Sequence, residues 1–187
     1  MTKKEIIQEL NNISVLRENR IRVANLILQD KESFVILLKI VFDVNNKTSI
    51  KAAWIFEFVC KKQINGLYAN LDFFVNNIQK VHFGSAVRPI AKICQLLVLK
   101  NKKTPILNFT DKHKEKIIET CFDWMLSNHK VAIKAYTMQT LFYLGKKENW
   151  VHDELVTLII NNIDSETAAY KSRGLITLAQ IKKFKSR

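Results

Sequence analysis

Apolar residues recur at helical spacing along almost the whole chain. In the segment 117–125 they fall at i, i+1, i+4, i+5 and i+8, with charged residues on the opposite side. A second type of helix begins near Ser49, where apolar residues cover most of the circumference up to Val59. Helices with one buried face alternate with helices that need neighbours on most sides, which is typical of stacked helix pairs. The sequence therefore predicts an all-α protein without strands.

Four short segments repeat one pattern, a small residue followed by an apolar and a basic residue. They are Ser49–Lys51, Ala86–Arg88, Ala132–Lys134 and Ala169–Lys171, and their basic residues lie 37, 46 and 37 positions apart. These spacings are close to the ~40 to 47 residues of HEAT and armadillo units. The longer interval is attributed to an inserted basic loop at Lys100–Pro105.

A second internal similarity supports this register. The segment Phe73–Ile78 resembles Leu158–Ile163, and each lies just before one of the four basic segments. The register predicts outer helices near residues 33–43, 67–80, 111–126 and 151–163. It predicts inner helices near residues 49–62, 85–100, 130–145 and 166–183. The expected N-caps of these inner helices are Thr48 or Ser49, Ser85, Asn128 and Ser165.

Length and composition fit one domain. With 187 residues, 48% of them apolar, the chain can bury roughly 70% of its unfolded surface. We expect a single helical-repeat domain over residues 1–187, a short solenoid of four to five antiparallel helix pairs. An N-terminal helical cap at 1–32, with helices near 2–12 and 14–29, is followed by helix-pair repeats at 33–62, 67–100, 110–146 and 150–184.

The small, apolar, basic pattern that opens each inner helix resembles HEAT repeats over about residues 33–183. The stretches Lys51–Cys60, Ser85–Cys94 and Lys134–Leu141 are also similar to a family of short bacterial helical-repeat proteins of unassigned role, often named adenylosuccinate lyase. The Ser-Ser-x-Met-Pro-x-Lys-x-Asn loop of that enzyme has no counterpart, because the nearest stretch, Gly84–Pro89, lacks the paired serines and the Met-Pro. The resemblance implies an armadillo-type α-solenoid without lyase activity.

The net charge of +13 is the one compositional extreme. It favours nucleic acid or an acidic surface as a partner, although 24 of the 30 basic residues are lysines and phosphate recognition favours arginine. Equivalent positions of successive repeats lie side by side, so the four repeated basic residues should form a ladder. Those residues are Lys51, Arg88, Lys134 and Lys171.

Two interpretations of this ladder stay open. In the first, it lines a concave groove for an acidic protein partner or a phosphate backbone. In the second, each basic group pairs with an aspartate or a helix C-terminal carbonyl, with Asp43 and Asp164 well placed to accept. Lys92 and Gln95 follow Arg88 by one and two turns on the same face, which makes the second repeat the most polar part of the predicted groove.

Trp54 and Glu57 share a helical face, and Lys51 lies one turn earlier. The combination of Trp, acidic and basic residues resembles the cleft of HEAT-like alkylpurine DNA glycosylases, while core packing is the competing interpretation for Trp54. The candidate partner-binding residues are therefore Lys51, Arg88, Lys92, Gln95, Lys134, Lys171, Trp54 and Glu57.

No motif indicates catalysis, a cofactor or a metal. The chain has no Gly-rich phosphate loop, CxxC pair or HExxH motif. Its cysteines lie in separate apolar stretches at no metal-like spacing, which predicts buried reduced thiols at Cys60, Cys94 and Cys121. The histidines lie near predicted turns and are expected on the surface, with a local pair between His113 and Asp111; they are His82, His113, His129 and His152.

The N-terminal residues lack the apolar centre of a secretory signal, and the longest apolar run, Phe34–Phe42, has about half of the ~20 residues that cross a bilayer. A cytoplasmic location without membrane contact is expected. Polar residues of the last inner helix, Arg173, Thr177 and Gln180, favour a monomer. The leading function is a non-enzymatic interaction or scaffold module for a protein partner. The alternative is a nucleic-acid-backbone binder that resembles HEAT-like DNA repair proteins.

Overall fold

The chain folds into two layers of helices. A computed structural model describes residues 1–14 and 16–186, which form ten α-helices, two short 3-10 helices and no strands. The stack begins with α1 (Lys3–Asn11) and α2 (Arg17–Ile27). The first layer then holds α3 (Lys31–Val41), α5 (Leu71–Asn77), α7 (Asp111–Leu126) and α9 (Asn149–Asn162). The second layer holds α4 (Thr48–Lys62), α6 (Gly84–Lys103), α8 (Val131–Leu144) and α10 (Ala168–Lys185).

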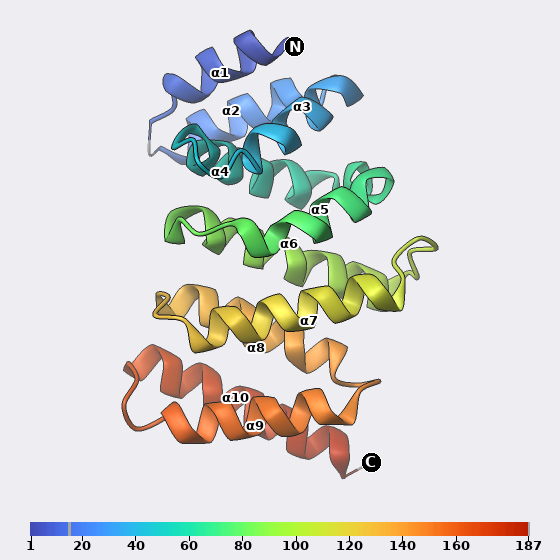
Figure 1. The fold of residues 1–187 in the computed structure, drawn as a ribbon, viewed down its shortest axis with the longest axis vertical. Coiled ribbons are helices and arrows are strands. Elements are labelled where there is room, and N and C mark those ends of the chain that lie inside the picture. Colours follow the sequence, from blue (N-terminus) through green and yellow to red (C-terminus); the bar gives the residue numbers. More distant parts are fainter. Residues whose placement is uncertain (15, 187) are drawn as a thin grey trace.

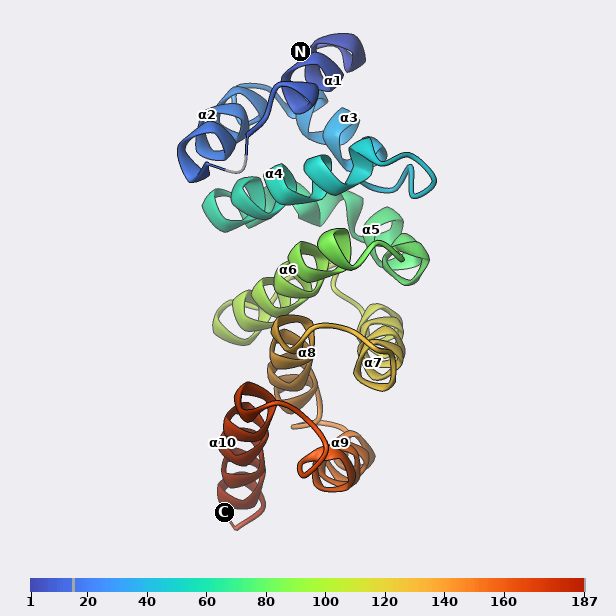
Figure 2. The same cartoon turned by 90° about the vertical axis from the view of Figure 1, so that its left-hand side faces the viewer.

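The helix pairs follow one another along the long axis, and α1 and α10 lie at its opposite ends (Figure 1). Turned by 90°, the same stack shows α6, α8 and α10 as a column with α7 and α9 beside it (Figure 2). Successive second-layer helices pack on one another along the stack, whereas α7 and α9 make much less contact with each other. The predicted all-α stack of helix pairs is therefore confirmed.

Two details of the predicted elements are wrong. The expected outer helix at 67–80 is interrupted, because 3-10 helices η1 (Ile64–Asn70) and η2 (Ile78–Lys80) flank a short α5. The loop expected to begin at Lys100 begins at Thr104 instead, since α6 continues through Lys103. Thr104 is extended, with φ −141° and ψ 109°, as expected for the residue before a proline.

The N-caps expected for the inner helices are also wrong. Helices α4, α6 and α8 have no side-chain cap, and α10 is capped by Thr167, whose hydroxyl accepts from the Tyr170 N–H at 3.3 Å. The sequence offered capping residue types within a few positions of each start, but Thr48 and Ser49 lie inside α4. The positions of these residue types therefore located the helix starts approximately, but they did not identify the capping residues.

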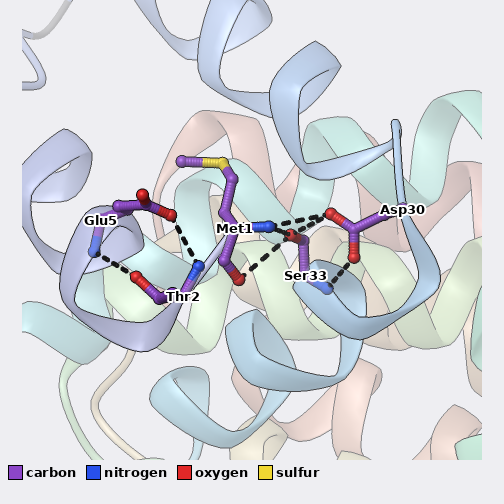
Figure 3. Close-up of polar contacts among 5 residues, drawn as sticks. All are labelled: Met1, Thr2, Glu5, Asp30 and Ser33. Carbon is purple, nitrogen blue, oxygen red and sulfur yellow. Dashed lines mark hydrogen bonds and ion pairs between the residues drawn. The ribbon is translucent and has the colours of Figure 1, made fainter.

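A polar cluster ties the N-terminal end together (Figure 3). The Met1 ammonium group donates to Asp30 Oδ2 at 2.9 Å and to Ser33 Oγ at 2.6 Å. Asp30 accepts from the Ser33 hydroxyl at 2.5 Å and caps α3 by accepting from the Ser33 N–H at 2.8 Å; these two hydrogen bonds, with a smaller effect of the Met1 ammonium group, hold the pKa of its carboxyl far below the usual range. Thr2 and Glu5 form a reciprocal capping box at the start of α1.

One apolar core runs from Ile6 in α1 to Ile181 in α10. The expected burial of the cysteines is confirmed, since Cys60, Cys94 and Cys121 are buried and free. Burial raises the pKa of all three thiols, that of Cys94 to about 12. Within the described residues, none of the helices combines the length and hydropathy that a membrane span requires.

Candidate functional site

The two outermost ladder residues are bonded to local acceptors. Lys51 Nζ donates at 2.9 Å to the main-chain carbonyl of Asn11, the last residue of α1. A cation at a helix C-terminus is favourable because the carbonyls there carry partial negative charge. Lys171 Nζ lies 3.2 Å from Asp164, which was expected as an acceptor. Asp43, the other expected acceptor, receives neither bond, because Asn11 takes its place.

The two middle ladder residues meet carboxylates on a neighbouring helix or loop. Arg88 Nη2 of α6 lies 2.8 Å from Glu57 of α4, and Lys134 of α8 is paired with Glu166, just before α10. All four ladder residues therefore have acceptors, but those of Arg88 and Lys134 are glutamates, where the pairing interpretation expected aspartates or helix C-terminal carbonyls. Lys51, Arg88 and Lys134 link successive helix pairs, whereas the bond of Lys171 stays within the last pair.

Glu57 receives a second cation from its own helix. Its side chain is 4% exposed, and both carboxylate oxygens are used, one by Lys61 and the other by Arg88. A buried carboxylate is costly unless it is paired, so these two cations make its burial possible. Lys61 lies one turn after Glu57 on α4, a spacing typical of helical ion pairs that the sequence already contains.

Lys92 and Arg173 differ from the ladder because their hydrogen-bond acceptors are neutral. Lys92 Nζ donates to Gln95 Oε1 at 2.8 Å and lies 4.5 Å from the centroid of the Tyr136 ring. Arg173 Nη1 donates to Gln139 Oε1 at 3.3 Å. Among residues 1–14 and 16–186, neither side chain forms an ion pair, so no carboxylate lies in direct contact with either charge.

The electrostatics of Lys92 show which charges lie near it. Burial lowers the pKa of Lys92, and the neighbouring cations Lys61, Arg173 and Arg88 lower it further, against an opposing effect of Glu57. We call Lys61, Arg88, Lys92 and Arg173 the inner cation cluster. Its four cations come from α4, α6 and α10, and among the described residues Glu57 is the one carboxylate paired with any of them, so this part of the second layer carries an excess of positive charge.

Trp54 is half-buried and joins three helices. Its indole N–H donates to the main-chain carbonyl of Ser85 at 3.0 Å, and the Arg20 guanidinium lies 4.6 Å from its ring centroid. The ring is thus neither a core residue nor an open platform for stacking, since Arg20 of α2 already covers one of its faces.

Two of the four histidines are not on the surface, and the prediction for them is wrong. His113 is buried, with Nε2 2.8 Å from Asp72 Oδ1 and Nδ1 accepting from the Thr110 N–H at 3.2 Å; Asp111 is not its partner. His152 is fully buried and bonds the Phe142 carbonyl through Nε2 at 2.8 Å, and burial lowers its pKa. Both rings pack between helices, and within the described residues no acidic, histidine and cysteine side chains cluster as metal ligands do.

Two surface hollows are formed by described residues. The larger of the two, about 550 Å³, lies where the loop after α6 meets the turn after α8; there Lys114 pairs with Asp111 and Lys102 lies over the Tyr143 ring. The smaller, about 320 Å³, lies between α8 and α10 and is lined by small and apolar residues together with Arg173. Arg173 of the inner cation cluster therefore borders a surface depression.

Comparison with known proteins gives one match. A family model described as a HEAT repeat domain matches residues 7–177. No curated protein matches the chain. No solved structure matches it.

Proposed function

The chain belongs to the HEAT repeat family, and from this premise we propose that it is a non-enzymatic interaction module whose second helix layer binds an acidic segment of a protein partner. Stacked repeats of this kind create extended concave surfaces. The closer packing of the second layer supports a concave shape on that side. The observation that carries the proposal is the pair of cations, Lys92 and Arg173, whose acceptors are neutral amides.

The inner cation cluster suits carboxylates on a flexible chain. Its cations lie on three helices, and Arg173 lines the depression between α8 and α10, so several acidic side chains of one peptide could be bound together. The arginines of the cluster can bind a carboxylate through two parallel hydrogen bonds. Small and apolar residues of α8 and α10 beside Arg173 would contact the apolar parts of the same peptide. In this proposal Arg88, Lys92 and Gln95 bind or orient the partner, and Lys51 and Lys171 mainly hold the stack.

Binding to a nucleic-acid backbone is the second candidate, because the net charge is +13 and basic residues occur all along the chain. It would use the same cations, together with Lys51, Trp54 and Lys134. A compact cluster fits a short acidic segment better than a long phosphate backbone, which is typically bound by a stripe of cations. The coverage of Trp54 by Arg20 also weakens the case for base stacking.

Fluorescence anisotropy with a labelled polyglutamate peptide, and separately with single-stranded and duplex DNA, tests the proposal. The double variant Lys92→Glu/Arg173→Glu should weaken peptide binding by about tenfold or more, equivalent to ~1.4 kcal/mol. The control variant Lys3→Glu/Lys4→Glu changes the net charge equally at exposed positions of α1, and it should bind within about twofold of the parent protein, because charges beyond the screening length contribute little.

Three results would contradict the proposal. Equal losses in the two double variants would show that only net charge attracts the peptide. DNA binding that is tighter than peptide binding and falls steeply with salt would favour the nucleic-acid candidate. Turnover of a small molecule that is lost in an Arg88→Ala variant would show that the protein is an enzyme.

A further inference from the structure

The end of the stack formed by α9 and α10 exposes apolar residues that interior repeats bury. Ile160 of α9 is 55% exposed and Leu175 of α10 is 56% exposed. In the repeat register, Phe73–Ile78 corresponds to Leu158–Ile163, so Ile160 corresponds to Val75, which is 2% exposed. The last helix pair therefore carries an interior type of residue on an outward surface.

Helix α10 also exposes an apolar residue at a position that other repeats bury. Leu175 follows Lys171 by four residues, as Met138 follows Lys134 and Ile55 follows Lys51. Met138 and Ile55 are both fully buried in their repeats. The side of α10 around Leu175 also carries the exposed small residues Ala168 and Ala179 at helical spacing, which permits close approach of another helix, and the exposed Lys171 lies one turn before Leu175. We call Ile160, Leu175, Ala168 and Ala179 the end face.

The polar residues of α10 that favoured a monomer in the sequence are largely covered. Thr177 is 1% exposed and donates its hydroxyl hydrogen to the Arg173 carbonyl, while Arg173 and Gln180 are half-buried. These residues do not face outward from the end of the stack. The reason given for a monomer is therefore lost.

The opposite end of the stack cannot cover the end face of another copy. Helix α1 buries Ile6 and Leu10 and exposes Lys3, Lys4 and Gln8. Head-to-tail stacking would bury these lysines against apolar side chains, which is unfavourable for unpaired charges. The matching apolar surface in a second copy is its own end face, which points to a two-fold arrangement.

Charge along α10 also suits two antiparallel copies. The helix is preceded by Asp164, whose side chain is 94% exposed, and its last turns carry Lys182 and Lys183, which form no ion pair among the described residues. When two α10 helices cross antiparallel at Leu175, the basic end of each lies toward the acidic start of the other. The helix dipoles are then opposed as well, which is favourable.

We propose that two copies of this chain associate through the end face, with α10 packed against α10 of the second copy about a two-fold axis. A layer of two helices about 27 Å long and about 20 Å wide offers a flat area of roughly 500 Å² per copy. That is below the ~800 Å² per partner of a standard interface, so the dimer forms reversibly and dissociates on dilution. The surface bound by an acidic partner remains open on the second layer, independently of this contact.

Sedimentation velocity of the full chain over a wide concentration range tests the dimer. The mass should rise from 21.8 kDa toward twice that value as concentration increases. The variant Ile160→Glu/Leu175→Glu should stay monomeric at every concentration, and because both side chains are exposed its folding should be unaffected. The matched control is Ile176→Glu, which changes the neighbouring exposed residue that lines the hollow between α8 and α10; it should dimerise like the parent.

A Leu175→Cys variant adds a second readout. Under mild oxidation it should form a disulfide between two copies, because the three native cysteines are buried and unreactive. A parent protein of constant 21.8 kDa mass would overturn the proposal, and so would a dimer that survives Ile160→Glu/Leu175→Glu. Equal loss of dimer in Ile176→Glu would place the contact on another face. Growth beyond a dimer would indicate open, head-to-tail assembly.

Discussion

Lys134 and Lys92 lie on neighbouring helices of the same layer, but their charges meet different surroundings. Lys134 is buried and paired with Glu166 of the next repeat. Lys92 is half-buried, bonds a neutral amide and has three cations near it. A balanced charge links repeats, whereas an unbalanced charge reduces stability and attracts an acidic ligand. Lys51, Lys134 and Lys171 therefore stabilise the fold, and the inner cation cluster, to which the fourth ladder residue Arg88 also belongs, is the better candidate for binding.

The largest change in stability is expected at Glu57, the carboxylate that pairs with both Lys61 and Arg88. Glu57→Ala should lower the free energy of unfolding by about 2 to 3 kcal/mol, because two cations lose their buried partner while remaining partly hydrated. The same change should strengthen polyglutamate binding by removing the single negative charge. Urea unfolding and anisotropy measure the two effects, with the exposed Glu154→Ala as the control. Unchanged stability would show that Glu57 is not a structural link.

A smaller loss of stability is expected at the ladder itself. Lys134→Met should cost about 1 to 2 kcal/mol, because Glu166 is left with little water and without its partner. Lys171→Met is the matched control; its pair with Asp164 is exposed and should contribute less than about 0.5 kcal/mol. Urea unfolding of both variants gives the comparison. Equal losses would contradict the distinction between buried and exposed pairs.

Removing the unbalanced charges should leave stability almost unchanged. Lys92→Met and Arg173→Met should each alter the free energy of unfolding by less than about 0.5 kcal/mol, or raise it, because repulsion between cations is relieved. Each variant should nevertheless weaken polyglutamate binding. Measuring unfolding and binding on the same samples separates the two roles. A variant that unfolds easily and binds normally would reverse this interpretation.

The smallest expected effect is the change of stability and of peptide binding with pH at Lys92. Burial and the neighbouring cations lower the pKa of Lys92 in the folded protein below that in the unfolded chain, so between these two pKa values the unfolded chain holds more protons. The contribution of Lys92 to stability is therefore unfavourable at neutral pH and improves as pH rises through this window. Peptide binding should fall over the same alkaline range. In Lys92→Arg the side chain keeps its charge, so binding should persist there; equal pH profiles for the two proteins would contradict this.

Sequence periodicity was sufficient for the layers and for the ladder. The basic anchors at Lys51 and Lys134 gave the register from which the helix pairs followed. The periodicity could not show which acceptor each cation binds. The Asn11 carbonyl lies 40 residues from Lys51 in the sequence, and Glu166 lies 32 residues from Lys134. Those contacts depend on the way that repeats stack, which no local pattern encodes.

The inner cation cluster was only partly predictable. Arg88 and Lys92 were found because they share a face of α6, but Arg173 lies on α10 and approaches them only after three helices have stacked. The buried histidines were missed for a related reason. His113 and His152 lie near helix starts, where exposure is usual, and they are covered by neighbouring helices.

The central claim is that Lys92 and Arg173 bind an acidic segment while the outer ladder residues hold the stack. NMR of the lysine and arginine side-chain nitrogens during a polyglutamate titration tests it most directly. The account predicts saturable shifts at Lys92 and Arg173, with Lys51 and Lys171 nearly unchanged because their acceptors already occupy them. Shifts spread evenly over all basic side chains, or concentrated on Lys51 and Lys171, would contradict it.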